Sequence, residues 1–159
     1  MNILIIDDDI EILDALRITL EPTGHNFEFF QNPLEAVEVY KQKLHDIIIT
    51  DISMPEISGI EVLKRARKIN SDAYIILITG YKDLNAAIEA VNHQAYAFFD
   101  KPVDIEGLLD TIDRIDLEKK GVQNKEEERD KMISEIDKLK KTVDELNNLY
   151  NTIKKGKKF

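Results

Sequence analysis

Acidic and other polar side chains stand at the ends of four apolar runs of the sequence. The set comprises Asp7, Asp8, Asp9, Asp51, Thr79, Asp100 and Lys101. Carboxylates that gather in one place repel one another unless a cation lies among them. A hard cation that keeps part of its water shell, as Mg²⁺ does, suits a few carboxylates and a carbonyl. The residue types therefore predict an oxygen-ligated Mg²⁺ site, provided that the fold brings these runs together.

Two alternating patterns indicate how the fold brings the ends of these runs together. Short runs rich in β-branched and aromatic residues predict five strands, at 3–6, 26–30, 46–50, 74–79 and 95–99. Apolar residues at spacings of three and four predict five helices between and after them, at 10–20, 34–39, 60–69, 84–91 and 105–115. The strands at 3–6, 46–50 and 74–79 are nearly all apolar, as strands covered on both faces must be. The repeated order predicts an α/β fold with a five-stranded, doubly wound parallel sheet, whose ligands bind at the carboxyl ends of the strands.

Simpler roles compete for some of the polar residues. Asp9 precedes a predicted helix, where an Asp caps the first backbone N–H groups. Thr79 alone would be a turn hydroxyl, and Lys101 alone a solvated strand end. One Asp is enough for a cap, however, so Asp7 and Asp8 need another explanation. The coincidence of these residue types at four strand ends favours a site.

From residue 116 onward the sequence changes character and carries a heptad stripe. Its seam residues are Met132, Ile136, Leu139, Val143, Leu146, Tyr150 and Ile153. β-branched residues at position a with Leu at d favour a parallel dimer, so we expect a coiled-coil helix over 131–155. A lone amphipathic helix folded back on the body is the alternative. Charged residues fall on the same phase over 118–130, which predicts a soft joint that links the helix to a domain at 1–117.

Composition and charge exclude several classes of protein. The net charge is −9, and residues 1–115 carry 21 acidic against 10 basic side chains, which disfavours direct binding to nucleic acid. With no Cys and three scattered His, disulfides, thiol nucleophiles and zinc sites are not expected. The apolar runs are far too short to cross a membrane, and the N-terminus lacks a signal-peptide pattern, so we expect a cytoplasmic protein.

Four segments resemble the motifs of a known family. They are ILIIDDD, DIIITDISMPEISGIEVL, IILITGY and FFDKPVD, in that order. Together they resemble the receiver domains of bacterial two-component response regulators, over residues 1 to about 117. The stretch from Thr79 to Ile112 is similar to receivers of enhancer-binding activators and of sensor-kinase-associated regulators.

The resemblance implies a role for each residue of the predicted site. Asp51 would accept the phosphoryl group, and Mg²⁺ would be held by Asp7, Asp8 and the backbone carbonyl of Ser53. Thr79 and Lys101 would contact the phosphoryl oxygens. Since no Gly-rich phosphate loop is present, we expect the donor to be a histidine kinase rather than ATP. The protein would catalyse only its own phosphorylation and dephosphorylation.

The resemblance also implies a switch and an output surface. Thr79 would move toward the phosphoryl group and Phe98, three residues before Lys101, would turn inward. The output face would span residues 83–115, followed by the coiled-coil tail of a homodimer. Ser53 and Tyr81 flank the path of a hydrolytic water, and neither can orient it firmly, so we expect slow loss of the phosphoryl group.

Other functions remain open at this point. The chain could be the N-terminal regulatory part of a larger response regulator, or an intermediate in a phosphorelay. A haloacid-dehalogenase-type phosphatase would use Asp7 as nucleophile, but Ile10 and Glu11 do not continue that motif and Asp51 and Lys101 would have no assigned role. A structural coiled-coil protein with a degenerate receiver would not need the intact Asp51 and Lys101 set.

Overall fold

The computed structural model describes residues 1–80 and 84–156, apart from the side chains of residues 84, 149 and 153–156. Its strands are β1 (Asn2–Ile6), β2 (Asn26–Phe30), β3 (Ile47–Asp51), β4 (Tyr74–Thr79) and β5 (Ala97–Asp100). The helices are α1 (Ile10–Leu20), α2 (Pro33–Gln42), α3 (Gly59–Ile69), α4 (Leu84–Asn92) and α5 (Ile105–Gly156), with a short 3₁₀ turn, η1, at Glu21–Thr23. Contacts divide the chain into two units, 1–115 and 116–159.

The five strands form one parallel sheet in the order β2-β1-β3-β4-β5. The winding therefore starts at β1 and reverses once, which confirms the predicted doubly wound α/β fold. β3 includes Asp51 as its last residue. β5 begins at Ala97 rather than at the predicted residue 95, because the chain turns at Gln94, whose φ is 59°.

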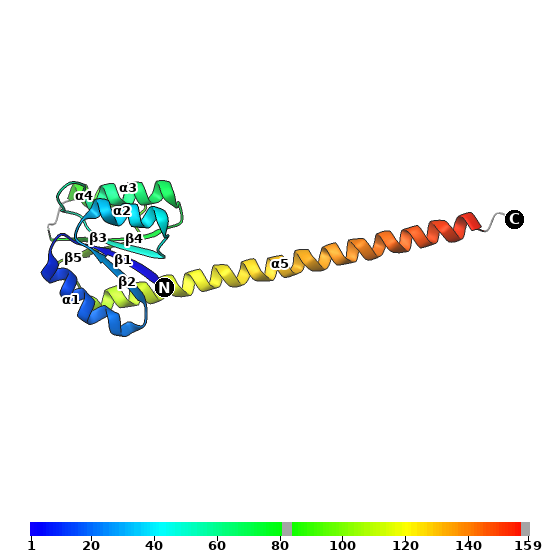
Figure 1. The fold of residues 1–159 in the computed structure, drawn as a ribbon, viewed down its shortest axis with the longest axis horizontal. Coiled ribbons are helices and arrows are strands. Elements are labelled where there is room, and N and C mark those ends of the chain that lie inside the picture. The colour runs from blue at the N-terminus through cyan, green and yellow to red at the C-terminus, as the bar shows by residue number, and fades with distance from the viewer. Residues whose placement is uncertain (81–83, 157–159) are drawn as a thin grey trace. The chain divides into compact units, whose positions relative to one another are not determined.

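Side chains alternate between the two faces of the sheet and build two cores. On one face, Leu4 and Ile6 pack with residues from α2, α3 and α4. On the other face, Ile3 and Ile5 pack with residues from α1 and the first turns of α5. Figure 1 shows α2 and α3 together on one side of the sheet and α1 on the other. Covering on both faces explains why β1, β3 and β4 are nearly all apolar before their polar ends.

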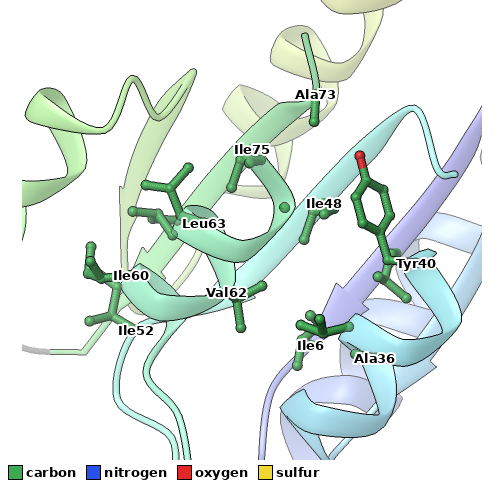
Figure 2. Packing of buried hydrophobic residues seen from close by; sticks show 14 of the residues in the cluster. Ile6, Ala36, Tyr40, Ile48, Ile52, Ile60, Val62, Leu63, Ala73 and Ile75 are labelled. Carbon is green, nitrogen blue, oxygen red and sulfur yellow. The ribbon is translucent and has the colours of Figure 1, made fainter. Parts of the chain in front are cut away.

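The core under α2 and α3 is closely packed around the centre of the sheet. Figure 2 shows Tyr40 of α2 beside Ile48 of β3, and Val62 and Leu63 of α3 over the strands. All four side chains are almost completely buried. Burial of large apolar side chains is worth about 1.5–3 kcal/mol each, so this layer holds the strand ends in fixed positions.

The helices begin at capping residues that the sequence supplies. Asp9 accepts a hydrogen bond from the backbone N–H of Glu11, so it caps α1 as the simpler interpretation predicted. Asn32 caps α2 ahead of Pro33, and Ser58 caps α3 by accepting from the N–H of Glu61. Each cap fixes where a helix leaves the carboxyl edge of the sheet.

The C-terminal unit is helical, because α5 continues through the segment expected to be a joint and ends at Gly156. The seam residues are exposed within a single chain. Their exposed fractions are Met132 63%, Ile136 48%, Leu139 65%, Val143 53%, Leu146 59% and Tyr150 64%. The side chain of Ile153 lies outside the described residues. Among the residues that the structure describes, no helix is long and apolar enough to cross a membrane.

Candidate functional site

The predicted site residues meet at the carboxyl edge of the sheet. Asp7 directly follows β1, and Asp51 ends the adjacent strand β3. Thr79 ends β4, and Lys101 directly follows β5. Because these four strands are neighbours in the parallel sheet, their ends converge on one place, as the sequence predicted.

Lys101 joins the carboxylates of the site. Its ammonium Nζ lies 2.7 Å from Oδ2 of Asp7 and 3.0 Å from Oδ1 of Asp51. Its backbone N–H donates to the carbonyl of Thr79 at 2.7 Å, which ties the end of β5 to the end of β4. The ammonium is therefore held in place from both the side chain and the backbone.

Burial and pairing act in opposite directions on the charges of this site. The side chains of Asp7 and Asp51 are only 3% and 4% exposed. Burial raises the pKa of Asp7, although hydrogen bonds from Lys101 and from the Asp9 N–H partly oppose it. Burial alone would lower the pKa of Lys101, but its hydrogen bonds to the two carboxylates raise the pKa above its usual value. Lys101 therefore stays charged at neutral pH.

Three carboxylates form a group that could hold a cation. Asp7, Asp8 and Asp51 each offer one oxygen, and these oxygens lie within 4.8 Å of one another. Asp7 and Asp51 are buried and Asp8 is exposed, so the group opens toward solvent on the Asp8 side. Hard oxygen ligands in this number fit Mg²⁺, which keeps several waters. Asp9 is not part of the group, because its carboxylate caps α1.

The backbone after Asp51 is held by a close contact that sequence reasoning missed. The N–H of Gly59 donates to the carbonyl of Ile52 at 3.0 Å, and the N–H of Ile52 donates to the carbonyl of Ile78 at 2.9 Å. A Cβ on Gly59 would lie 2.1 Å from the backbone oxygen of Asp51. Only glycine lets α3 begin this close to Asp51. A Gly directly after the helix cap Ser58 was the available signal.

The residues predicted to complete the metal site, the switch and the water path are Ser53, Thr79, Phe98 and Tyr81. Thr79 is buried at the end of β4, and Ser53 is exposed just beyond Asp51. Phe98 lies in β5 opposite Leu77 and is 36% exposed. Tyr81 lies outside the described residues. The metal-ligand role of Ser53 and the switch roles of Thr79 and Phe98 stay predictions.

Comparison with protein families shows the family to which the first unit of the chain belongs. A family model described as "response regulator receiver domain" matches residues 3–113. The chain belongs to the response regulator receiver family. The resemblance of the four sequence motifs is thereby confirmed, and so is the fold that it implied.

The receiver has relatives among transcriptional regulatory proteins. It is 38% identical over 112 residues to the phosphoglycerate transport system transcriptional regulatory protein PgtA of Salmonella typhimurium, covering 70% of this chain and 27% of PgtA. It is 33% identical over 113 residues to the C4-dicarboxylate transport transcriptional regulatory protein DctD of Pseudomonas aeruginosa, covering 71% of this chain and 24% of DctD. The chain thus spans about a quarter of the length of these relatives.

Solved receiver structures share the fold. A CheY-like receiver domain protein from Methanospirillum hungatei has a TM-score of 0.71 and 31% identity, covering 76% of this chain and 97% of that one. A receiver domain protein from Clostridium thermocellum has a TM-score of 0.72 and 31% identity, covering 76% and 98%.

Proposed function

We propose that this receiver takes a phosphoryl group from the phosphohistidine of a histidine kinase onto Asp51. The observation that carries the proposal is the buried carboxylate of Asp51 with the Lys101 ammonium 3.0 Å away. A carboxylate oxygen of Asp51 would form the new bond to phosphorus as the phosphorus–nitrogen bond breaks, and the imidazole would leave with the electron pair. Such transfer depends on positioning and on neutralising the charge of the phosphoryl oxygens.

Mg²⁺ fits the acidic group of the site. Asp7 and Asp8 would hold it together with Asp51 and the carbonyl of Ser53. When bound, it supplies positive charge to the phosphoryl oxygens. Lys101 supplies a second positive charge, and Asp7 keeps that ammonium in position through the 2.7 Å contact. The hydroxyl of Thr79 would donate to a phosphoryl oxygen.

Phosphorylation would be signalled through α4, β5 and the start of α5. Thr79 would move toward the phosphoryl group, and Phe98 would turn inward. The predicted apolar side of α4 supports an interaction surface, because Ile88 and Val91 are 49% and 76% exposed rather than buried. Exposed apolar side chains that gather on one face favour a protein partner.

The exposed seam of α5 supports pairing with a second copy of the chain. Large apolar side chains contribute about 1.5–3 kcal/mol each when they are fully buried. The cost of association and the partial burial at a two-helix seam reduce this gain. We propose that the seam, with Ile153, forms a coiled-coil homodimer.

Further details follow from the same proposal. The phosphoryl group would be lost slowly, because neither Ser53 nor Tyr81 can firmly orient a hydrolytic water. The only reactions that we propose are phosphorylation and dephosphorylation of the protein itself. We place the protein in the cytoplasm, without direct contact to nucleic acid or membrane. The short coverage of PgtA and DctD favours a second candidate, in which this receiver is the regulatory part of a larger regulator. A phosphorelay intermediate remains a further alternative.

The phosphoacceptor is tested with a small-molecule phosphodonor such as acetyl phosphate. We expect intact-mass spectrometry to show one phosphate adduct on the parent protein and none on Asp51→Asn, whose amide keeps the shape but is no nucleophile. Asp100→Asn is the matched control, because Asp100 is an exposed carboxylate at the end of β5. An adduct on Asp51→Asn, or its absence from both the parent and the control, would refute the assignment.

A further inference from the structure

The charged segment between the receiver and the apolar seam, residues 118–130, is continuous helix, and its side chains are exposed apart from the half-buried Lys119. The heptad phase of the seam, extended backward, places Val122 and Arg129 at position a and Lys125 at position d. All three are exposed, and Val122 is 54% exposed. Charged seam residues argue against an ordinary apolar coiled coil here, but they do not argue against pairing if a second helix supplies opposite charges.

Each of these basic seam residues has an acidic neighbour on the flank of the stripe. Glu126, at position e, follows Lys125, and Glu128, at position g, precedes Arg129. In a parallel, in-register pair, a d residue lies beside the partner's e residue, and an a residue lies beside the partner's g residue. Lys125 would then meet Glu126 of the second copy, and Arg129 would meet its Glu128. By symmetry the pairing gives four opposite-charge contacts, which outnumber the two like-charge contacts of Lys125 and of Arg129 with the same residues of the second copy across the seam.

The charges concerned have no competing ion-pair partner in the part of the chain that the structure describes. Among the residues that the structure describes, Lys125, Glu126, Glu128 and Arg129 form no ion pair with another side chain. Neighbouring charges do pair internally, as Lys120 does with Asp116 at 2.5 Å. The four side chains are therefore available to a second helix.

The flanks of the apolar seam also select the parallel arrangement. Glu135 at g and Lys140 at the next e would pair across a parallel dimer. An antiparallel pair that aligns the seam would bring e residues together and so place Lys140 opposite the second copy's Lys140. It would also leave the segment 118–130 of each chain beyond the end of the other seam.

We infer that residues 118–130 are an ionic continuation of the interface, in which Lys125 and Arg129 bind Glu126 and Glu128 of a second, parallel copy of this chain. The inference rests on the proposed dimer. Residues 118–130 would then not be a soft joint but a paired segment, and salt would weaken the pairing. Exposed ion pairs are screened at high ionic strength, whereas the apolar seam is not.

Charge reversal on the full chain tests the pairing. The acidic variant carries Lys125→Glu with Arg129→Glu, and the basic variant carries Glu126→Lys with Glu128→Lys. In about 50 mM salt we expect each variant alone to self-associate about tenfold more weakly than the parent. An equimolar mixture should restore at least parent-like affinity as a heterodimer, because the four flanking contacts and the two contacts across the seam are then all opposite in charge. The control, Glu127→Lys with Lys131→Glu, changes charges at positions f and c away from the seam.

Sedimentation velocity in low and high salt provides the measurement. If the parent dimerises and the variants do so equally well, the ionic segment is unpaired and this inference is wrong, while the apolar dimer stands. If the parent is monomeric at about 100 μM, a weak affinity by the usual scale, the proposed dimer itself fails. Recovery in the mixture also shows that both variants are folded.

Cross-linking gives an independent test, since the chain has no native Cys. A single Val122→Cys at position a should form an intermolecular disulfide on mild oxidation with oxidised glutathione. Gln123→Cys at position b should not, because it faces away from the seam. Equal cross-linking of the two variants, or none for Val122→Cys in a dimeric protein, would overturn the paired segment.

Discussion

The ammonium of Lys101 and the carboxylate of Asp51 lie 3.0 Å apart, although they come from strand ends on either side of β4. The same ammonium also contacts Asp7, so one cation pairs with two nearly buried carboxylates and offsets one of their two negative charges. This arrangement makes the site stable before any ligand arrives and leaves its charge balance sensitive to single substitutions.

Lys101→Met should destabilise the protein by about 1–3 kcal/mol at neutral pH, because it leaves Asp7 and Asp51 without their cation. The loss should shrink as the pH falls, since Asp7, whose pKa burial already raises, then takes up a proton. Added Mg²⁺ should recover part of it. Urea unfolding measures these effects. Lys64→Met is the control, because Lys64 makes only a 3.8 Å surface pair with Glu89, and it should change stability little.

Asp8→Ala and Asp9→Ala should separate two roles of adjacent aspartates. Asp8→Ala removes a charge from the proposed cation site, so we expect Mg²⁺ affinity to fall about tenfold or more by calorimetry while stability changes little. Asp9→Ala removes the cap of α1 and should lower stability by about 1 kcal/mol with Mg²⁺ affinity largely kept. The reverse pattern would contradict both assignments.

Gly59→Ala should be strongly destabilising and should slow phosphorylation, because its Cβ would overlap the backbone oxygen of Asp51 at 2.1 Å. Gly121→Ala is the matched substitution in α5, where a Cβ meets nothing within 4 Å. There we expect a gain of about 0.5–1 kcal/mol from helix propensity. Thermal unfolding and the rate of phosphate incorporation distinguish the two sites, and a harmless Gly59→Ala would show that the backbone at Asp51 can shift freely.

Stability should fall as the pH drops below about 6.5, the ordinary value for an unfolded histidine, because His45 is buried. Burial lowers the pKa of His45, although Glu28, 3.5 Å from Nε2, opposes the shift. Lys43 also faces this site and pairs with the same Glu28. The ring of Tyr40 stacks on the imidazole. The unfolded chain therefore binds the proton more tightly, and stability is lost on acidification at up to about 1.4 kcal/mol per pH unit.

His45→Phe should flatten this dependence, whereas the exposed control His93→Gln should leave it unchanged. Urea unfolding between pH 5 and 7.5 measures it. An unchanged slope in His45→Phe would assign the dependence to other groups.

The sequence predicted the sheet and the polar edge well, because both follow from local patterns. Buried strands are nearly all apolar, and the repeated order of strands and helices leaves few ways to wind them. The apolar spacing over 84–91 predicts α4 but not which of its sides is buried. Ile88 and Val91 have helical spacing but are exposed, and the small side chain of Ala90 is buried instead. Periodicity shows that an apolar stripe exists but does not show whether the body of the same chain covers it.

Contacts between distant residues were beyond local patterns. The burial of His45 depends on the packing of α2 against β3, and its spacing in the sequence gave no sign of it. The turn at Gln94 has a positive φ, and Arg67 of α3, 27 residues earlier in the chain, donates to the Gln94 carbonyl at 2.5 Å. A contact over that separation leaves no local pattern in the sequence. Charged residues on the seam phase predict a soft joint at 118–130, and the structure shows this segment as continuous helix, in keeping with Lys and Glu being good helix formers.

The continuity of α5 has a consequence for how the protein folds. Starting a helix is the unfavourable step, and each further residue adds to it at little cost. Leu108, Ile112 and Ile115 are fixed in the hydrophobic core, and the same helix runs on to Gly156. We therefore expect folding of the receiver to provide the nucleus from which the tail elongates, so that helicity just beyond Ile115 depends on the core that fixes the first turns of α5.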